Sequence, residues 1–357
     1  MTGFLCLIVL VFTTALFSLA GKYPDKMGYA LKKPQTILGV VLFSLLVGLR
    51  YNPDVDPDFL GYWGVAEYGN SFYEYDRIEI LPRLLADIVH LFHWPPSAWF
   101  ILMGAILAFF SLFAACRLSN RFMPIVFYGL MLLYLSFDMN VMRQGVAISV
   151  FLCAVTYIGE RNWKKYLLFV TLAYCFHKSS IIWSVSYFLT FLNWREKTFR
   201  YIFIIVLCSA LVFKAFDYVL QNFGFVFTLL GKEQITNMAD LDLMMMDKKG
   251  SGLGVIIRYI RWGVLLYFIP KIAKNSEDHG LFCIFILFLI GVLMDLFSMY
   301  SIILTRIALY PQITELLLYP YVFIYNKSTL IKFIAIFQVL FLTYVLFGYL
   351  DKWQFVI

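Results

Sequence analysis

Five arginines are the residues of this sequence whose placement most suggests chemistry. All of them lie at an end, or in the outer half, of an apolar run: Arg50, Arg143, Arg258, Arg261 and Arg306. Ionisable groups at membrane depth are costly, so they mark substrate sites or buried pairs. Guanidinium groups bind phosphate oxygens bidentately and do not deprotonate, so these arginines could converge on one polyanion. Internal salt bridges to Asp138, Asp295 and Glu315 are the alternative.

A short acidic loop offers carboxylates close to the first of these arginines. Three aspartates alternate there with other residues: Asp54, Asp56 and Asp58. Their spacing resembles the DxD motif of metal-dependent glycosyltransferases, in which two carboxylates hold a divalent cation. An aspartate beside an arginine cluster would also stay ionised and could act as a base. Because Pro53 and Pro57 equally fit an ordinary turn, a solvated acidic loop is the alternative.

His177 is a second candidate base. It lies beside Lys178 in an apolar stretch, and histidine transfers protons near neutral pH. A histidine in such a stretch is more often a satisfied interior group, so both interpretations stay open. The six cysteines lie in apolar segments without a CxxC pair, and no Walker, GxSxG or HExxH motif occurs. We therefore predict a reaction that uses neither a metal ion nor a cofactor.

The composition indicates which elements position these residues. Hydrophobic residues make up 62% of the 357 residues and charged residues only 14%, where soluble domains have about 45–50% and about 25%. The apolar residues suffice for about ten or eleven membrane-spanning helices of roughly 20 residues, which leaves no sizeable soluble domain. We predict an all-α polytopic integral membrane protein with about 11–12 transmembrane helices. Its single transmembrane domain covers residues 1–357.

Basic residues predict the orientation and one unusual hairpin. Loops that we place in the cytoplasm hold 16 of the 29 Lys and Arg residues but only 5 of the 22 Asp and Glu residues. Topology therefore explains the net charge of +7 without a nucleic-acid partner. Basic clusters flank the apolar segment 166–192 on both sides, so it should enter the membrane and return. Its 27 residues are too few for two full α-helical crossings, so we expect a re-entrant hairpin of short helices with its apex near 177–180.

Two long loops fall on the outer side of the membrane. The first, about 50–96, has aromatic residues from Tyr62 to Tyr75 that could stack sugar rings or form an interfacial belt. Within it, 78–93 has a helical pattern too polar to face lipid. The second loop, about 221–253, ends in a glycine-rich stretch that suits a mobile lid. The other apolar runs are at 2–20, 35–49, 97–116, 123–137, 144–159, 201–220, 254–270, 281–303, 305–325 and 331–350.

Four short blocks resemble the EpsG branch of Wzy-type polysaccharide repeat-unit polymerases, in the family's order. GLRYNPDVDPDFLGYW (48–63) is similar to its arginine, acidic-aromatic and tyrosine pattern, and MNVMRQGVAISVFL (139–152) to its Arg-Gln helix start. LAYCFHKSSIIW (172–183) resembles its Ala-Phe-His-Ser segment, and SIILTRIALY (301–310) its late arginine segment. The resemblance places these residues at family positions: Arg50, Asp58, Tyr62, Glu79, Arg143, Gln144, His177, Ser179 and Arg306. An apparent two-residue insertion leaves Asp56 and Asp58 as alternatives for the acid.

The resemblance implies a multi-pass enzyme of the bacterial plasma (inner) membrane with a GT-C-like helical fold. Such an enzyme takes a growing glycan from undecaprenyl pyrophosphate and joins it to the next lipid-linked repeat unit on the outer, periplasmic face. The product, whether O-antigen, capsule or exopolysaccharide, stays open, as does a chain-length regulator as a further partner.

We therefore expect a glycosyl transfer in which outer-side residues hold the donor pyrophosphate and the substrate. The expected contacts are Arg50, Tyr62, Glu79, Arg143, Gln144, Arg258, Arg261 and Arg306. The expected base is Asp56, Asp58 or His177. A flippase or exporter of lipid-linked oligosaccharide, and an O-antigen ligase or other GT-C glycosyltransferase, are the alternatives. Charges concentrated on the outer half and the absence of an internal repeat favour an enzyme over a transporter.

Overall fold

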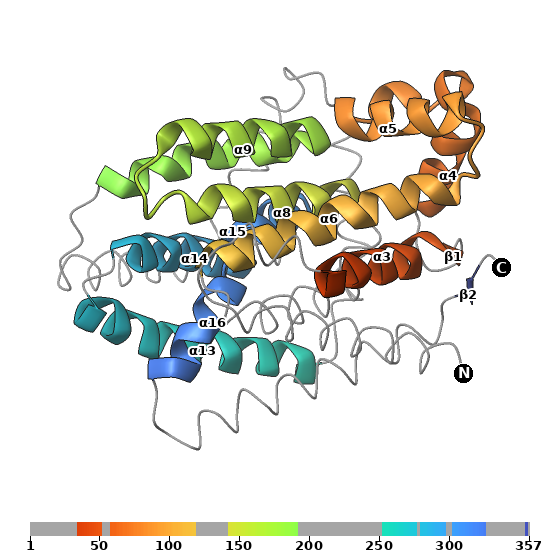
Figure 1. Cartoon of the computed structure of the whole chain (residues 1–357). Helices are drawn as coiled ribbons and strands as arrows, with labels where there is room; N and C mark the ends of the chain where they lie inside the picture. The colour runs from red at the N-terminus through yellow and green to blue at the C-terminus, as the bar shows by residue number, and fades with distance from the viewer. Residues whose placement is uncertain are drawn as a thin grey trace. The chain divides into compact units, whose positions relative to one another are not determined.

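The computed structural model describes residues 34–51, 58–118, 142–191, 252–276, 279–297, 302–325 and 354–355 (Figure 1). Several expected features lie outside the described residues: the runs 2–20, 123–137, 201–220 and 331–350, most of the loop 221–253, and Asp56. The described residues form helices and one pair of two-residue antiparallel strands. The predicted all-α class is therefore confirmed.

The chain forms two compact units, which divide after Tyr187 and after Glu315. The first contains α3 (Pro34–Gly48), β1 (Arg50–Tyr51), α4 (Phe59–Tyr68), η1 (Gly69–Ser71), η2 (Tyr75–Arg77), α5 (Ile80–Leu91), α6 (Ser97–Leu118), α8 (Met142–Thr156), α9 (Trp163–Phe176), most of η5 (Lys178–Phe191), most of α16 (Glu315–Tyr325), and β2 (Gln354–Phe355). The second contains α13 (Gly252–Ser276), α14 (His279–Phe297) and α15 (Ile302–Gln312).

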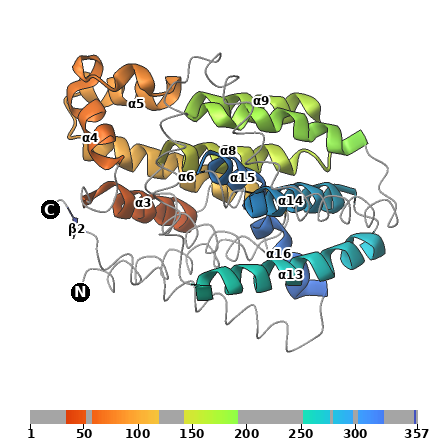
Figure 2. The same ribbon diagram turned by 180° about the vertical axis from the view of Figure 1, so that it is seen from behind.

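Helix α8 lies at the centre of the first unit. It packs against α6 and α9, while α6 also packs against α3, and α5 packs against α6 and α9. Both views show α5 and α9 in one row over α6 and α8, with α3 on the other side of α6 (Figure 1, Figure 2). Every α8 side chain is buried except that of Arg143. A helix that buries all its sides lies inside packed protein, so α8 presents one accessible charge, at its N-terminal end.

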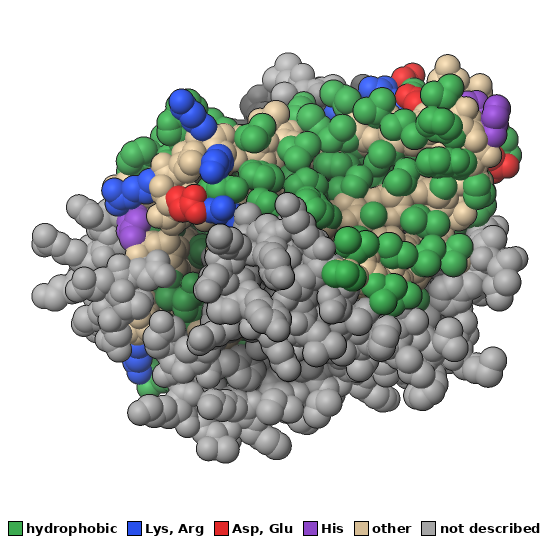
Figure 3. Space-filling view, in the orientation of Figure 1, with side chains coloured by type: hydrophobic (Ala, Val, Ile, Leu, Met, Phe, Trp, Pro, Cys, Tyr) green, Lys and Arg blue, Asp and Glu red, His purple; other side chains and the backbone are tan. Residues whose placement is uncertain are grey.

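The first unit carries a broad apolar surface. Exposed apolar side chains lie on α3, α5 and α9, among them Ile37, Val41, Leu84 and Leu168. Figure 3 shows apolar side chains covering the face over α3, α5 and α6, with charged side chains toward its margins. Among the described residues, the segment Ser97–Ala114 of α6 is long and apolar enough to cross a membrane, and α3, α8 and α14 contain shorter apolar stretches.

The chain turns back at His177. This residue is extended, with φ −156° and ψ 120°, between α9 and the 3-10 helix η5. Tyr166 Oη donates to the Trp183 carbonyl oxygen at 2.6 Å, and Tyr187 Oη donates to the Arg161 carbonyl oxygen at 2.6 Å. The return arm therefore lies beside α9. The chain reversal that the flanking basic clusters predict is present, at the predicted apex.

The return arm differs from the short α-helix that we expected. Its first three buried side chains recur every three residues, at Ser180, Trp183 and Ser186, which is the period of a 3-10 helix, and Thr190 follows four residues later. At about 2.0 Å per residue, its 14 residues span roughly 28 Å, whereas the 14 residues of α9 span about 21 Å. The length argument from sequence assumed α-helical rise and therefore made this arm too short.

The apolar run 305–325, expected as one span, is broken in the middle. Helix α15 ends at Gln312 and α16 begins at Glu315. Pro311 has no amide hydrogen and its ring crowds the preceding turn, so the helix ends one residue after it. Thr314 Oγ1 donates to the Pro311 carbonyl oxygen at 2.6 Å and closes the turn. The break places the Glu315 carboxylate at a helix N-terminus, where negative charge is favoured.

Candidate functional site

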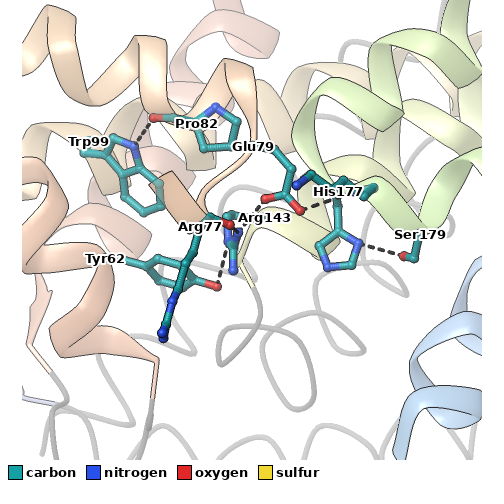
Figure 4. A network of polar contacts seen from close by, with 9 residues as sticks. Tyr62, Arg77, Glu79, Pro82, Trp99, Arg143, His177 and Ser179 are labelled. Atoms are coloured by element: carbon teal, nitrogen blue, oxygen red, sulfur yellow. Dashed lines mark hydrogen bonds and ion pairs between the residues drawn. The ribbon is translucent and has the colours of Figure 1, made fainter. Parts of the chain in front are cut away.

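Arg143 joins three segments that are far apart in the sequence. Its Nε donates to Tyr62 Oη at 3.2 Å, and its Nη1 donates to the Arg77 carbonyl oxygen at 3.4 Å and to Glu79 Oε2 (Figure 4). Tyr62 lies on α4, Arg77 and Glu79 lie just before α5, and Arg143 lies in the first turn of α8. The segment before α5 and the central helix are therefore tied together at one guanidinium group.

Tyr62 is a rigid support for this arginine. Its side chain is 3% exposed, and its ring centroid lies 5.3 Å from Arg143 Cζ and 5.3 Å from the Trp99 ring. Trp99 is fixed in turn, because its Nε1 donates to the Pro82 carbonyl oxygen at 2.9 Å. The expectation that the aromatic cluster lies in a wet loop and stacks sugars is wrong for Tyr62, because packing removes its ring from solvent. Tyr73 of the same cluster is 77% exposed.

Glu79 links the arginine to the apex of the hairpin. It is 8% exposed and uses both carboxylate oxygens: Oε2 accepts from Arg143 Nη1, and Oε1 accepts from the Lys178 backbone N–H at 3.3 Å. His177 precedes that amide, and its Nδ1 lies 2.7 Å from Ser179 Oγ. The site therefore contains a cation, a buried carboxylate and an imidazole from three helical segments.

The guanidinium of Arg143 keeps one side available. All of its bonds to the described residues involve Nε and Nη1, and its side chain is 20% exposed. Within the part of the chain that the structure describes, its Nη2 donors have no partner. A guanidinium that is held through Nε and Nη1, in a side chain that is one-fifth exposed, suits an incoming anion.

Two more expected site residues lie next to this network. Asp58 precedes α4, and its carbonyl oxygen accepts the Tyr62 N–H at 3.1 Å, so it lies one helical turn from Tyr62. Gln144 follows Arg143 and is fully buried in α8. Both therefore belong to the same end of the first unit as the arginine.

The loop that leads to Glu79 is anchored by Tyr75. The Tyr75 hydroxyl lies 2.6 Å and 2.7 Å from the two carboxylate oxygens of Asp87 on α5, to which it donates. Arg83 Cζ lies 5.4 Å from the centre of the Tyr75 ring, and Arg83 Nη1 lies 3.5 Å from Asp76 Oδ1. The pKa of Tyr75 is raised to about 12, first by burial and then by the hydrogen bond to Asp87. This clasp fixes the approach of the chain to Glu79.

Arg261 occupies a separate arrangement in the second unit. Its Nε lies 3.0 Å from Glu315 Oε2 and its Nη2 lies 2.9 Å from Glu315 Oε1, a bidentate pair. Trp262 Nε1 also donates to Glu315 Oε2, at 3.0 Å. The side chains of Arg261 and Glu315 are 12% and 4% exposed. Of the two interpretations from sequence, pyrophosphate binding and an internal salt bridge, the structure shows the salt bridge.

The remaining predicted arginines are described only in part. The Arg50 backbone pairs with Phe355 in the β1–β2 ribbon, and its side chain lies outside the described part. Arg258 lies on α13, again without a described side chain, and Arg306 lies on α15 with a half-buried side chain. The described residues contain no group of three His, Cys, Asp or Glu side chains placed to hold a metal ion.

Sequence reasoning missed two tryptophans of these networks. Trp99 supports Tyr62, and Trp262 binds the carboxylate that Arg261 binds. Trp99 lies near the start of the apolar run 97–116, where an interfacial belt is the ordinary explanation, and Trp262 lies in the middle of the run 254–270. The adjacency of Trp262 to Arg261 was the one available signal, whereas nothing in the sequence distinguishes Trp99.

The comparison with protein families gives a match that covers most of the chain. The sequence model of the EpsG family matches residues 36–356. This chain belongs to the EpsG family. That family is the family of Wzy-type polysaccharide polymerases. Comparisons with the curated proteins and with the solved structures give no match.

Three of the four EpsG-like blocks lie close together in the structure. Three of the four resembling blocks supply Tyr62, Arg143 and the His177–Ser179 pair, and Glu79 connects them. Residues that come from three separate segments and share one polar network in an otherwise apolar unit mark the candidate site of this EpsG protein. The fourth block, with Arg306, lies in the second unit.

Proposed function

We propose that this chain is a membrane-embedded glycosyltransferase that polymerises undecaprenyl-pyrophosphate-linked repeat units on the outer face of the bacterial plasma membrane. Family membership supports polysaccharide polymerisation. The observation that carries the rest is Arg143, a partly exposed guanidinium that Tyr62 and Glu79 orient in the first turn of a buried helix. The apolar surface over α3, α5 and α6 supports a position in the bilayer (Figure 3).

The proposed reaction moves a glycan from one lipid carrier to another. A hydroxyl oxygen of the acceptor sugar attacks the anomeric carbon of the donor, a new glycosidic bond forms, and the bond to the donor pyrophosphate breaks. The leaving pyrophosphate takes the bonding electrons, and Arg143 stabilises the developing charge through its Nη2 edge. No nucleotide sugar is needed, because the lipid pyrophosphate is the activated leaving group.

His177 is the base that the geometry favours. Its imidazole, whose Nδ1 lies 2.7 Å from Ser179 Oγ, takes the proton of the attacking hydroxyl. Glu79 connects the backbone beside His177 to Arg143, so base and pyrophosphate site belong to one network. Asp58, one turn from Tyr62, is the competing base, and Asp58→Asn compared with His177→Ala separates the two.

Reconstitution tests the proposal directly. Purified protein in liposomes is given lipid-pyrophosphate-linked repeat units, and the products are separated by size. We expect a ladder of polymers with the wild type, and at least a hundredfold slower ladder formation with Arg143→Ala, since removing one such donor costs roughly 10²–10³ in rate. Ladder formation by Arg143→Ala at the wild-type rate would contradict the assignment. Lipid relocation without a ladder would indicate a flippase, and transfer to another acceptor would indicate a ligase.

A further inference from the structure

We propose that Glu79 is a positioning residue that sets the hairpin apex, and with it His177, relative to Arg143. The inference rests on the proposed function and goes beyond it, because family position alone placed Glu79 among the substrate contacts. The geometry instead gives both of its carboxylate oxygens to the protein: one to Arg143 and one to the Lys178 amide.

The chemistry requires some such link. The leaving group and the attacking hydroxyl react only when the pyrophosphate site and the base are held at a fixed separation. Arg143 belongs to α8, whereas His177 lies at a turn between α9 and η5. His177 is extended, and its own N–H is used within α9, where it donates to the Ala173 carbonyl oxygen at 2.9 Å. Among the described residues, the hydrogen bond from the Lys178 amide to Glu79 therefore ties the apex to the arginine.

Burial makes the link stiff. Glu79 is 8% exposed, so its two bonds act in a region of reduced dielectric, where charge-assisted hydrogen bonds are stronger than in water. The carboxylate also balances the positive charge of Arg143 before a donor arrives. Glu79 binds Nη1 of Arg143 and not Nη2, so a pyrophosphate that binds Nη2 need not displace Glu79. The apex can then stay in place throughout the reaction.

One backbone substitution removes this link and little else. Lys178 is the first residue of η5, a position that tolerates proline because its N–H has no partner within the helix. The preceding residue, His177, already has the extended conformation that proline requires before it. Lys178→Pro therefore deletes the donor to Glu79 Oε1 without forcing the backbone. Lys178→Ala is the matched control, since it loses the same side chain and keeps the N–H.

The decisive comparison is the turnover of Lys178→Pro against Lys178→Ala with lipid-pyrophosphate-linked repeat units. We expect Lys178→Pro to have at least a tenfold lower kcat than Lys178→Ala. The KM for the donor should change less than threefold, because Arg143 still binds Glu79, Tyr62 and the Arg77 carbonyl oxygen. Equal kcat values for the two variants would overturn the inference. A loss of donor affinity equal to the loss of kcat would also overturn it, because Glu79 would then serve binding.

A second measurement does not depend on activity or on whether Lys178→Pro folds. Hydrogen exchange of the Lys178 amide should be slow in the wild type and at least tenfold faster in Glu79→Gln. The glutamine oxygen takes the position facing Arg143, so its NH2 group, a donor, faces the Lys178 amide. Glu79→Asp should restore part of the kcat that Glu79→Gln loses. Unchanged exchange in Glu79→Gln refutes the link itself. Changed exchange with normal kcat refutes its role in catalysis, and normal polymer from Arg143→Ala refutes the proposed function instead.

Discussion

Glu79 and Arg143 are 64 residues apart in the sequence and form an ion pair in which the carboxylate is 8% exposed and the arginine side chain 20% exposed. The Glu79 carboxylate is enclosed by protein, whereas the Arg143 side chain is partly exposed. An arginine paired in this way remains a cation in a fixed position, without the cost of leaving its charge uncompensated in an apolar unit.

Tyr62→Phe tests how far the orientation of Arg143 matters. The substitution removes the hydroxyl that accepts from Nε and keeps the ring that packs on Trp99 and under the guanidinium. Loss of one hydrogen bond to a charged group corresponds to about 1.5 kcal/mol, so we expect about tenfold slower polymerisation with normal amounts of folded protein. Tyr73→Phe, on an exposed side chain of the same loop, is the control. Equal rates for both variants would show that the Tyr62 hydroxyl does not orient the arginine.

The pair of Arg261 with Glu315 should behave as a structural bridge. Removal of either partner leaves a buried charge, so Arg261→Ala and Glu315→Ala should each destabilise the fold by about 3–5 kcal/mol. The double variant Arg261→Met with Glu315→Leu should recover part of that loss, because it removes both charges, while the Trp262 Nε1 donor loses Glu315 as its acceptor. Thermal unfolding in detergent measures all three variants. If Arg261→Ala unfolds like the wild type but makes no polymer, Arg261 is a substrate ligand after all.

The Tyr75 clasp predicts a loss of stability at high pH. The pKa of Tyr75 in the folded protein is about 12, against about 10 in an unfolded chain. The neutral hydroxyl is therefore favoured by folding, so its contribution is complete below about pH 10 and is lost as the pH rises through about 12. A difference titration of tyrosine absorbance, wild type against Tyr75→Phe, should show one group ionising near pH 12. If the tyrosine that Tyr75→Phe lacks ionises near pH 10 in the wild type, the result would contradict the clasp.

Ser180 gives a prediction of opposite sign to most core substitutions. Its Oγ is fully buried and makes no hydrogen bond to the described residues. Ser180→Ala therefore removes an unsatisfied polar atom and should be neutral or slightly stabilising. Ser149→Ala is the comparison, because the Ser149 hydroxyl is equally buried but donates to the Val146 carbonyl oxygen at 2.7 Å. Destabilisation of the Ser180 variant by more than about 1 kcal/mol would indicate that a bound water satisfies the hydroxyl.

The sequence by itself determined the all-α class of the described fold and the positions of three of its helices. Apolar runs at 35–49, 97–116 and 144–159 became α3, α6 and α8, because the period of apolar residues and the cost of exposing them are local properties of the chain. Two basic clusters were enough to predict the reversal near His177. Four short blocks were enough to indicate the family, which the comparison confirmed.

Only the tertiary structure decided which charges meet. Five arginines were equivalent in the sequence, yet Arg143 shares its carboxylate with the hairpin apex, while Arg261 forms a bidentate pair with Glu315. Partners 64 and 54 residues away along the chain made that difference, and no local pattern encodes such a separation. The 3-10 return arm and the break before Glu315 likewise depend on packing and on one proline. Local propensity places a residue on a helix, but the neighbours of that helix decide whether its charge faces a partner or a substrate.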